Sequence, residues 1–273
     1  MPAAETFLLP VDTGFRFCLL HRPDAGVRLR GALVVAPPFA EELNKSRRML
    51  ALAARALAAD GCAVLQMDFL GCGDSSNDFG DATWDGWIDD VVRAHDWLAA
   101  RFDAPLWIWG VRAGALLATA ALDRLARHPQ LLLWQPVVAG RQHLVQFLRV
   151  QMAGAMLRDG AQPAKAQALI ERLHAGEVLE VGGYTLAPPL ALGLHAADLS
   201  LPASFRGRIA CLEVTSNAEV TPAVAARAGQ WTREGRTFSA QAVDGPPFWQ
   251  TTEMAVAPAL IGATLRALRE EAQ

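Results

Sequence analysis

Short apolar runs alternate with segments of helical periodicity, and this alternation constrains the fold more than any other feature of the chain. The apolar runs cover residues 31–36, 62–67, 105–109 and 131–134. Between them, residues 44–59, 84–102 and 113–126 repeat apolar side chains at helical spacing. Strands that alternate with helices in this way form a parallel sheet with helices packed on its faces. The sequence therefore predicts an α/β fold.

The alternation stops at residue 140 and resumes after residue 205. Within that interval, residues 144–157 and 165–174 have helical patterns, and a stretch rich in glycine and proline follows at 182–189. Strand and helix patterns return at 208–214, 222–233, 237–243 and 255–270, and two strands at 6–9 and 15–20 precede the first half. We interpret residues 1–273 as one domain, with residues 140–205 as a helical cap inserted over one end of the sheet.

Composition excludes several classes of protein. Hydrophobic residues make up 52% of the chain, which is enough for a large core, and the net charge is −3 with no cluster of Lys and Arg of the kind that binds nucleic acid. The four cysteines lack C-x-x-C spacing and neighbouring histidines, so we expect no metal site and no cofactor. No uncharged apolar run has the length of a transmembrane segment, and the first residues lack a signal-peptide pattern. We therefore expect a cytoplasmic protein.

The motif Gly110-Val111-Arg112-Ala113-Gly114 follows one predicted strand and opens a predicted helix. In this context the frame G-x-X-x-G is typical of a nucleophile elbow, a sharp turn that needs small residues on both sides of a strained central residue. The small residues are present, but the central residue is Arg112 rather than Ser, Cys or Asp. The frame is thus retained without an obvious nucleophile.

Four segments carry a resemblance to a known family. They are PPFAEELNKSRRM (37–49), DFLGCGDSSNDFGDATWDGW (68–87), LWIWGVRAGALLA (106–118) and GPPFWQTTEM (245–254). Over nearly its whole length the chain resembles the α/β-hydrolase superfamily, and these segments resemble exosortase A system-associated hydrolase 2 in particular. The resemblance implies an α/β-hydrolase fold with a mostly parallel eight-stranded sheet. It also implies a place beside the bacterial machinery that sorts PEP-CTERM proteins and exports exopolysaccharide, which we consider a possible partner.

The resemblance also allows the catalytic triad to be sought position by position. The nucleophile position is Arg112, the turn that normally holds the acid places Asn217 there, and the turn that normally holds the histidine places Phe248 there. No histidine follows His195. All three members of a Ser-Asp-His triad are therefore replaced, and ordinary Ser-His-Asp hydrolysis is not expected.

Other parts of such a site are retained. In the superfamily the loop after the third strand donates one oxyanion-hole N–H, which here belongs to Phe39 or Ala40, and the residue after the elbow position, Ala113, donates the second. These donors suit an anionic or carbonyl oxygen. We expect the remaining pocket residues to be Asn44, Asn217, Phe248 and Trp249.

Arg112 is expected to have a compensating partner. A cation at a helix N-terminus costs roughly 0.3–1 kcal/mol, and a strained backbone at an elbow costs on the order of 1–3 kcal/mol. One hypothesis is a structural ion pair with Glu41 or Glu42, which follow the oxyanion loop. The other is a bound anion that makes the arginine part of a ligand site.

Two functions remain open on these grounds. The first is a hydrolase of an acyl ester or thioester, in which Glu41 or Glu42 activates water and Arg112 stabilises the oxyanion. The alternative is a non-catalytic ligand-binding or scaffold protein that uses Arg112 as an anion site, with a small acyl or anionic ligand. A third, an acyl transferase, is compatible with the fold, but no residue selects it.

Overall fold

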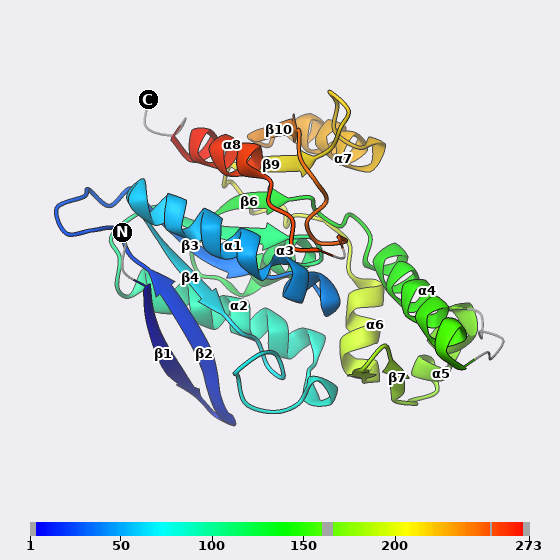
Figure 1. The fold of residues 1–273 in the computed structure, drawn as a ribbon. Helices are drawn as coiled ribbons and strands as arrows, with labels where there is room; N and C mark the ends of the chain where they lie inside the picture. The colour runs from blue at the N-terminus through cyan, green and yellow to red at the C-terminus, as the bar shows by residue number, and fades with distance from the viewer. Residues whose placement is uncertain (1–3, 160–165, 252, 270–273) are drawn as a thin grey trace.

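The computed structural model describes residues 4–159, 166–251 and 253–269, and eight of its strands form one sheet in the order β1-β2-β4-β3-β5-β6-β9-β10 (Figure 1). Strand β2 is antiparallel to both of its neighbours, whereas the other pairs are parallel. The mostly parallel eight-stranded sheet predicted from the sequence is confirmed. The strands are β1 (Ala4–Val11), β2 (Gly14–His21), β3 (Gly31–Ala36), β4 (Cys62–Met67), β5 (Leu106–Val111), β6 (Gln130–Trp134), β9 (Ile209–Val214) and β10 (Phe238–Val243).

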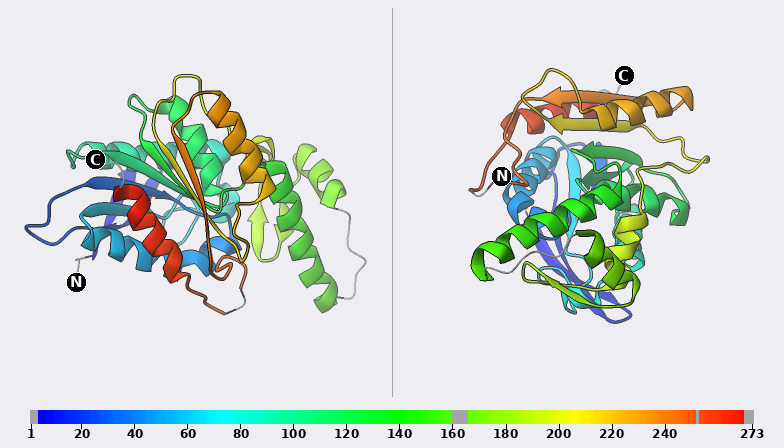
Figure 2. Two further views of the ribbon diagram at one scale, coloured as in Figure 1. Left: turned by 90° about the horizontal axis from the view of Figure 1, so that it is seen from above. Right: turned by 90° about the vertical axis from the view of Figure 1, so that its right-hand side faces the viewer.

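Helices cover both faces of this sheet, as the apolar runs of its central strands require. One buried cluster joins the sheet to α1 (Glu41–Ala59) and α8 (Pro258–Arg269). The larger cluster joins the opposite face to α2 (Trp84–Ala99), α3 (Gly114–Ala121) and α7 (Pro222–Arg233). Figure 2 shows these two helical layers on either side of the strands. Helix α3 is shorter than its predicted span because the chain continues as a 3₁₀ turn, η2 (Leu122–Arg124).

The segment predicted to be a cap leaves the sheet after β6 and returns at β9. It contains α4 (Gly140–Asp159), α5 (Ala166–His174), a hairpin of β7 (Leu179–Val181) and β8 (Tyr184–Leu186), and α6 (Pro188–Ala196). These elements gather at one end of the sheet (Figure 1), and α4 crosses in front of the molecule in the right-hand view of Figure 2. The Gly/Pro-rich stretch forms the hairpin turn, strand β8 and the first residues of α6. Position 165, which was expected to begin the second helix, lies outside the described residues.

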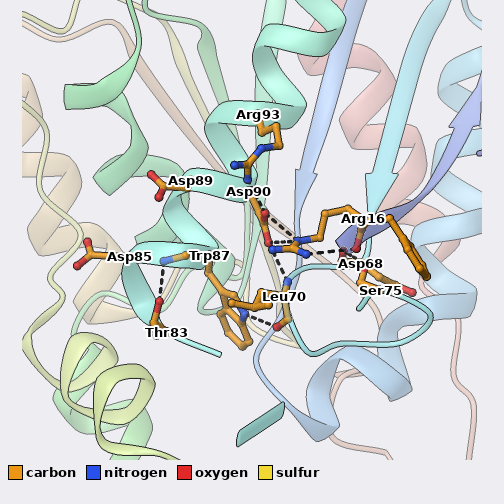
Figure 3. A network of polar contacts seen from close by, with 12 residues as sticks. Arg16, Asp68, Leu70, Ser75, Thr83, Asp85, Trp87, Asp89, Asp90 and Arg93 are labelled. Atoms are coloured by element: carbon orange, nitrogen blue, oxygen red, sulfur yellow. Dashed lines mark hydrogen bonds and ion pairs between the residues drawn. The ribbon is translucent and has the colours of Figure 1, made fainter. Parts of the chain in front are cut away.

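A buried ion pair fastens the antiparallel strand β2 to helix α2 (Figure 3). Arg16 Nε lies 2.9 and 2.8 Å from the two carboxylate oxygens of Asp90, and both side chains are buried. Asp90 also accepts bonds from the Leu70 N–H at 2.8 Å and from Arg93 at 3.0 Å. The loop after β4 continues to α2 through the short helix η1 (Phe79–Asp81). One carboxylate thus joins a strand, a helix and this loop.

Within the described residues, none of the helices has the length and apolar character needed to cross a membrane.

Candidate functional site

The elbow predicted at residues 110–114 is present between β5 and α3. Arg112 has φ 54°, the left-handed backbone that a sharp strand-to-helix turn requires. A Cβ on Gly110 would lie 2.6 Å from the Ala115 Cα, and one on Gly114 would lie 2.0 Å from the Ala36 carbonyl oxygen. The two glycines therefore let the chain reverse and let α3 approach the end of β3.

The Arg112 side chain is held by the protein itself. Its Nε lies 3.1 Å and its Nη2 lies 3.0 Å from the two carboxylate oxygens of Glu42. Nη1 donates to the Gln135 carbonyl at 3.2 Å, and the guanidinium carbon lies 5.1 Å from the centre of the Trp249 ring. The Arg112 side chain is only 12% exposed. Of the two partners expected for this cation, the structure provides a protein carboxylate, and it is Glu42 rather than Glu41.

The ends of β6 and β9 support this arrangement. Gln135, with φ 44°, donates its N–H to the Leu212 carbonyl, and its side-chain oxygen accepts the Val214 N–H at 2.7 Å. Its amide nitrogen lies 3.4 Å from the buried carboxylate of Glu213, which also accepts two bonds from Thr221. Glu213 thus links Gln135 at the end of β6 to Thr221 in the loop after β9. These contacts fix Gln135, whose carbonyl accepts the bond from Arg112.

A cavity of about 430 Å³ lies beside the Arg112–Glu42 pair, between α1 and α4. Its lining comes from four parts of the chain, which are the loop after β3, α1, α4 and the loop after β10. The lining residues are Phe39, Glu41, Glu42, Lys45, His143, Gln146, Phe147, Trp249 and Gln250. Aromatic walls with a few polar groups in such a volume are typical of a small-molecule site.

His143, like Gln146 and Phe147 of the same helix, lines the cavity although the sequence did not indicate it. It lies in the first turn of α4, its side chain is 6% exposed, and its Nε2 lies 3.9 Å from Glu42 Oε2. Burial lowers the pKa of His143, Glu42 opposes that shift and Arg112 adds to it. The resemblance points to a histidine after the last strand, and His143 lies before it in the chain. The available signal was position, because α4 begins just beyond the end of β6, at the edge of the sheet where ligands bind.

Glu41 has a different role from Glu42. Its Oε2 accepts a bond from the Tyr184 hydroxyl at 3.2 Å and lies 3.3 Å from Asn44 Nδ2. Asn44 also lies 3.1 Å from the Tyr184 hydroxyl, and burial together with Glu41 raises the pKa of Tyr184. These contacts join α1 to the β7–β8 hairpin. Asn44 itself is exposed and is not part of the cavity lining.

Two other expected pocket residues lie elsewhere. Asn217 is exposed in the loop after β9, where its N–H donates to Thr215 Oγ1 at 3.0 Å. Phe248 is 1% exposed and packs edge-on against Trp134 and Trp249 in the core beneath the cavity wall. Neither side chain belongs to the lining, whereas the neighbouring Trp249 does. Asn217 and Phe248, which the resemblance assigns to the acid and histidine positions, therefore do not line the cavity.

Of the expected oxyanion donors, Phe39 lines the cavity, whereas Ala40 and Ala113 are not part of the lining. Ala40 has φ 50° and precedes α1, and Ala113 precedes α3. Over the described ranges, the N–H groups of Phe39, Ala40 and Ala113 have no backbone or side-chain acceptor. Two helix N-termini thus bring free donors to the same edge of the sheet, where they suit an oxygen with negative charge.

The loop after β4 carries one thiol, that of Cys72. Burial raises the pKa of the Cys72 thiol to about 12, so it does not supply a thiolate at neutral pH. No group of three or more His, Cys, Asp or Glu side chains in the described ranges is arranged to hold a metal ion.

The chain was compared with known proteins by sequence and by structure. No family model and no curated protein matches its sequence. Among solved structures, XC6422 from Xanthomonas campestris, described as an α/β serine hydrolase without lid, is 18% identical with a TM-score of 0.55, and the match covers 98% of this chain and 92% of that one.

Two further solved structures are similar over nearly their whole length. Est1E from Butyrivibrio proteoclasticus, solved with ferulic acid bound, is 13% identical with a TM-score of 0.59, covering 97% of each chain. A thioesterase domain from the curacin biosynthetic pathway is 14% identical with a TM-score of 0.58, covering 98% of this chain and 99% of that domain. Identities this low establish a shared fold and nothing about activity.

Proposed function

We propose that this chain, which has the α/β-hydrolase fold, binds a small acyl compound in the cavity beside the elbow and does not hydrolyse it through a covalent serine-type intermediate. The observation that carries the proposal is the state of Arg112. At the position where the superfamily holds its nucleophile, a guanidinium donates to Glu42 and to the Gln135 carbonyl. A guanidinium has no available electron pair with which to attack a carbonyl carbon.

The ion pair supports the structural role of Arg112 over the anion-binding role. Glu42 occupies two of its nitrogens, and a bidentate carboxylate is the partner that such a fork binds best. A ligand anion would have to displace this carboxylate. We therefore assign Arg112 to fixing Glu42 and the cavity floor rather than to binding an anion.

The cavity suits an acyl compound on two counts. The rings of Phe39, Phe147 and Trp249 offer an apolar surface for a hydrocarbon or aromatic acyl chain. The N–H groups of Ala40 and Ala113 provide donors for its carbonyl oxygen. Esterases and a thioesterase domain share the fold, which motivates esters and thioesters as the compounds to test first.

The resemblance to exosortase A system-associated hydrolase 2 adds a cellular context to the proposal. In that context the ligand is an acyl compound handled beside the protein-sorting or exopolysaccharide machinery. Affinity purification of the tagged chain from its native host tests this, and we expect components of that machinery to be enriched over a host expressing the tag alone.

Two measurements on purified protein test the binding function. After exposure to an alkyl fluorophosphonate, which modifies activated serines, we expect the intact mass to be unchanged. We also expect non-hydrolysable acyl amides and alkyl ketones to raise the melting temperature. Calorimetry should give a dissociation constant about 5–30-fold higher for Phe147→Ala than for the wild type, because this substitution removes one aromatic ring that contacts the ligand.

Val178→Ala is the matched control, because Val178 is 52% exposed on the same insertion and outside the cavity. It should bind like the wild type. A phosphonate adduct would contradict the absence of a serine nucleophile. If no acyl compound stabilised the protein, or if Phe147→Ala bound as tightly as Val178→Ala, the cavity would not be the acyl site.

A further inference from the structure

One side chain of the cavity lining, that of His143, is available to act as a base. His143 is almost fully buried and lines the cavity, yet across the described residues neither ring nitrogen makes a hydrogen bond, and its ion-pair contact with Glu42 is 3.9 Å long. Buried polar groups are normally paired, and those without a protein partner mark a place for water or a ligand. The ring is also positioned, because Phe39 meets it edge-on with ring centres 6.1 Å apart.

The surroundings keep this imidazole neutral. Burial lowers the pKa of His143, and the nearby Arg112 lowers it further against the opposite effect of Glu42. The other charged side chains on the cavity wall are Glu41 and Lys45. At neutral pH the ring therefore has a free electron pair on one nitrogen, as a general base requires.

The base and the expected oxyanion donors are linked through neighbouring residues. Ala40 follows Phe39, which contacts the His143 ring. Ala113 follows Arg112, whose guanidinium bonds the carboxylate beside His143. Each expected donor is thus one residue away from a side chain that contacts His143 or its neighbour Glu42.

We propose that His143 is a catalytic general base that activates water directly against an acyl ester or thioester in this cavity, a hydrolysis without an acyl-enzyme. This inference rests on the proposed acyl-binding function. His143 takes a proton from water as the water oxygen bonds to the acyl carbon, and the carbonyl electron pair moves onto the oxygen held by Ala40 and Ala113. The C–O or C–S bond then breaks, and the leaving group takes the proton from His143. The products are a carboxylic acid, which releases its proton to solvent, and an alcohol or thiol.

Glu42 and Arg112 are positioning residues in this scheme. Arg112 holds the Glu42 carboxylate by two of its nitrogens, and that carboxylate lies beside the ring that becomes positively charged. The Glu42 carboxylate thus stabilises the imidazolium, and Arg112 holds that carboxylate in place.

The experiment uses the full chain with p-nitrophenyl esters and N-acetylcysteamine thioesters of acyl groups that bind as amides. In ¹⁸O-water we expect one heavy oxygen in the product acid, no initial burst and no acylated protein by mass. His143→Gln should lower kcat about 100–1,000-fold, as for loss of a general base, and bind the amide within about threefold of wild type.

His195→Gln is the matched control, since His195 also lies in the insertion but outside the cavity lining. It should retain wild-type turnover. Added imidazole should restore activity to His143→Ala, a rescue that a purely structural role would not give. The pH profile of kcat/KM should fall on the acid side through one group below the ordinary histidine range.

The outcomes separate the two proposals. Tight binding of the amide with no turnover by wild type, or with equal turnover by wild type and His143→Gln, would overturn the role of His143 alone. Absence of binding by every acyl compound would overturn the acyl-binding function and this inference together. An acylated protein would overturn the direct attack of water.

Discussion

At the scale of single residues, the Arg112–Glu42 ion pair stands where the elbow frame would suggest a nucleophile. Both side chains are mostly buried, so removal of one leaves the other without its partner in a partly dehydrated site. We expect Arg112→Gln or Glu42→Gln alone to lower the free energy of unfolding by about 1–3 kcal/mol. The free energy of unfolding lost by the double variant should be at least about 1 kcal/mol smaller than the sum of the losses of the two single variants. Urea denaturation of the four proteins measures this, and additive losses would contradict a functional ion pair.

The buried imidazole of His143 predicts a pH dependence. Because burial lowers its pKa, the folded state takes up a proton on this ring less readily than the unfolded chain. The corresponding stability is present above the ordinary histidine pKa of about 6.5 and declines as the pH falls below it. The wild type should therefore lose stability between pH 7 and 5 more steeply than His143→Gln. Urea midpoints across this range would give parallel profiles if the pKa were not lowered.

The same residues explain what the sequence could reveal about the site. The elbow was predictable because its glycines, strand and helix are adjacent in the chain. The sequence limits the carboxylate partner of Arg112 to Glu41 or Glu42. Which of the two faces the elbow depends on the rotation of α1 about its axis. The position of His143 just after β6 indicates this edge of the sheet, but whether its side chain faces the cavity depends on the path of α4. Phe248 was predictable as a residue of the final loop, but not as a core residue beneath it.

At the scale of elements, the close approach of α3 to the end of β3 predicts the effect of a single methyl group. A Cβ on Gly114 would lie 2.0 Å from the Ala36 carbonyl oxygen and 2.6 Å from that of Pro37, and backbone atoms cannot turn away. Gly114→Ala should therefore lower the free energy of unfolding by more than about 2 kcal/mol.

Gly262→Ala is the control, because that glycine lies inside α8 and its added Cβ would meet only the Arg266 guanidinium at 3.5 Å. Helix propensity predicts that this change stabilises by about 0.5–1 kcal/mol. Thermal and urea unfolding of both variants measure the contrast. Equal effects at the two glycines would mean that α3 does not approach β3 this closely.

The neighbours Asp89 and Asp90 on α2 offer a second contrast (Figure 3). Asp90 joins β2, α2 and the loop after β4 and is fully buried, whereas the Asp89 side chain is 55% exposed beside Arg124. Asp90→Asn should lower the free energy of unfolding by about 3–5 kcal/mol because it leaves Arg16 buried without its countercharge. Asp89→Asn should change it by less than about 1 kcal/mol. Similar urea midpoints for the two variants would contradict the difference in burial.

The elements themselves were largely predictable, since the central strands are apolar runs between amphipathic helices. The elements between β6 and β9 were less predictable. Their hairpin depends on Gly182 and Gly183, both with positive φ, and its strands are only three residues long. Periodicity cannot identify so short a strand, and a proline at the start of a helix reads equally well as a loop.

At the scale of the whole molecule, the sheet is most protected at its centre. Every residue of β3 is buried, whereas β1 lies at the edge with alternate residues exposed. We expect backbone amides of β3 to exchange with deuterium only on global unfolding, at least about 100-fold more slowly than those of β1. Hydrogen exchange of peptides that cover the two strands measures this. Equal protection would show that the edge strand unfolds only with the core.

The elbow also bears on how such a chain changes over generations. Gly110 and Gly114 enforce its reversal through the lack of space at their own positions, and the residue at the apex does not determine the shape. Selection can therefore exchange the apex residue in one step while the backbone stays in place. The shape of the turn and the chemistry of its apex residue can therefore change independently of one another.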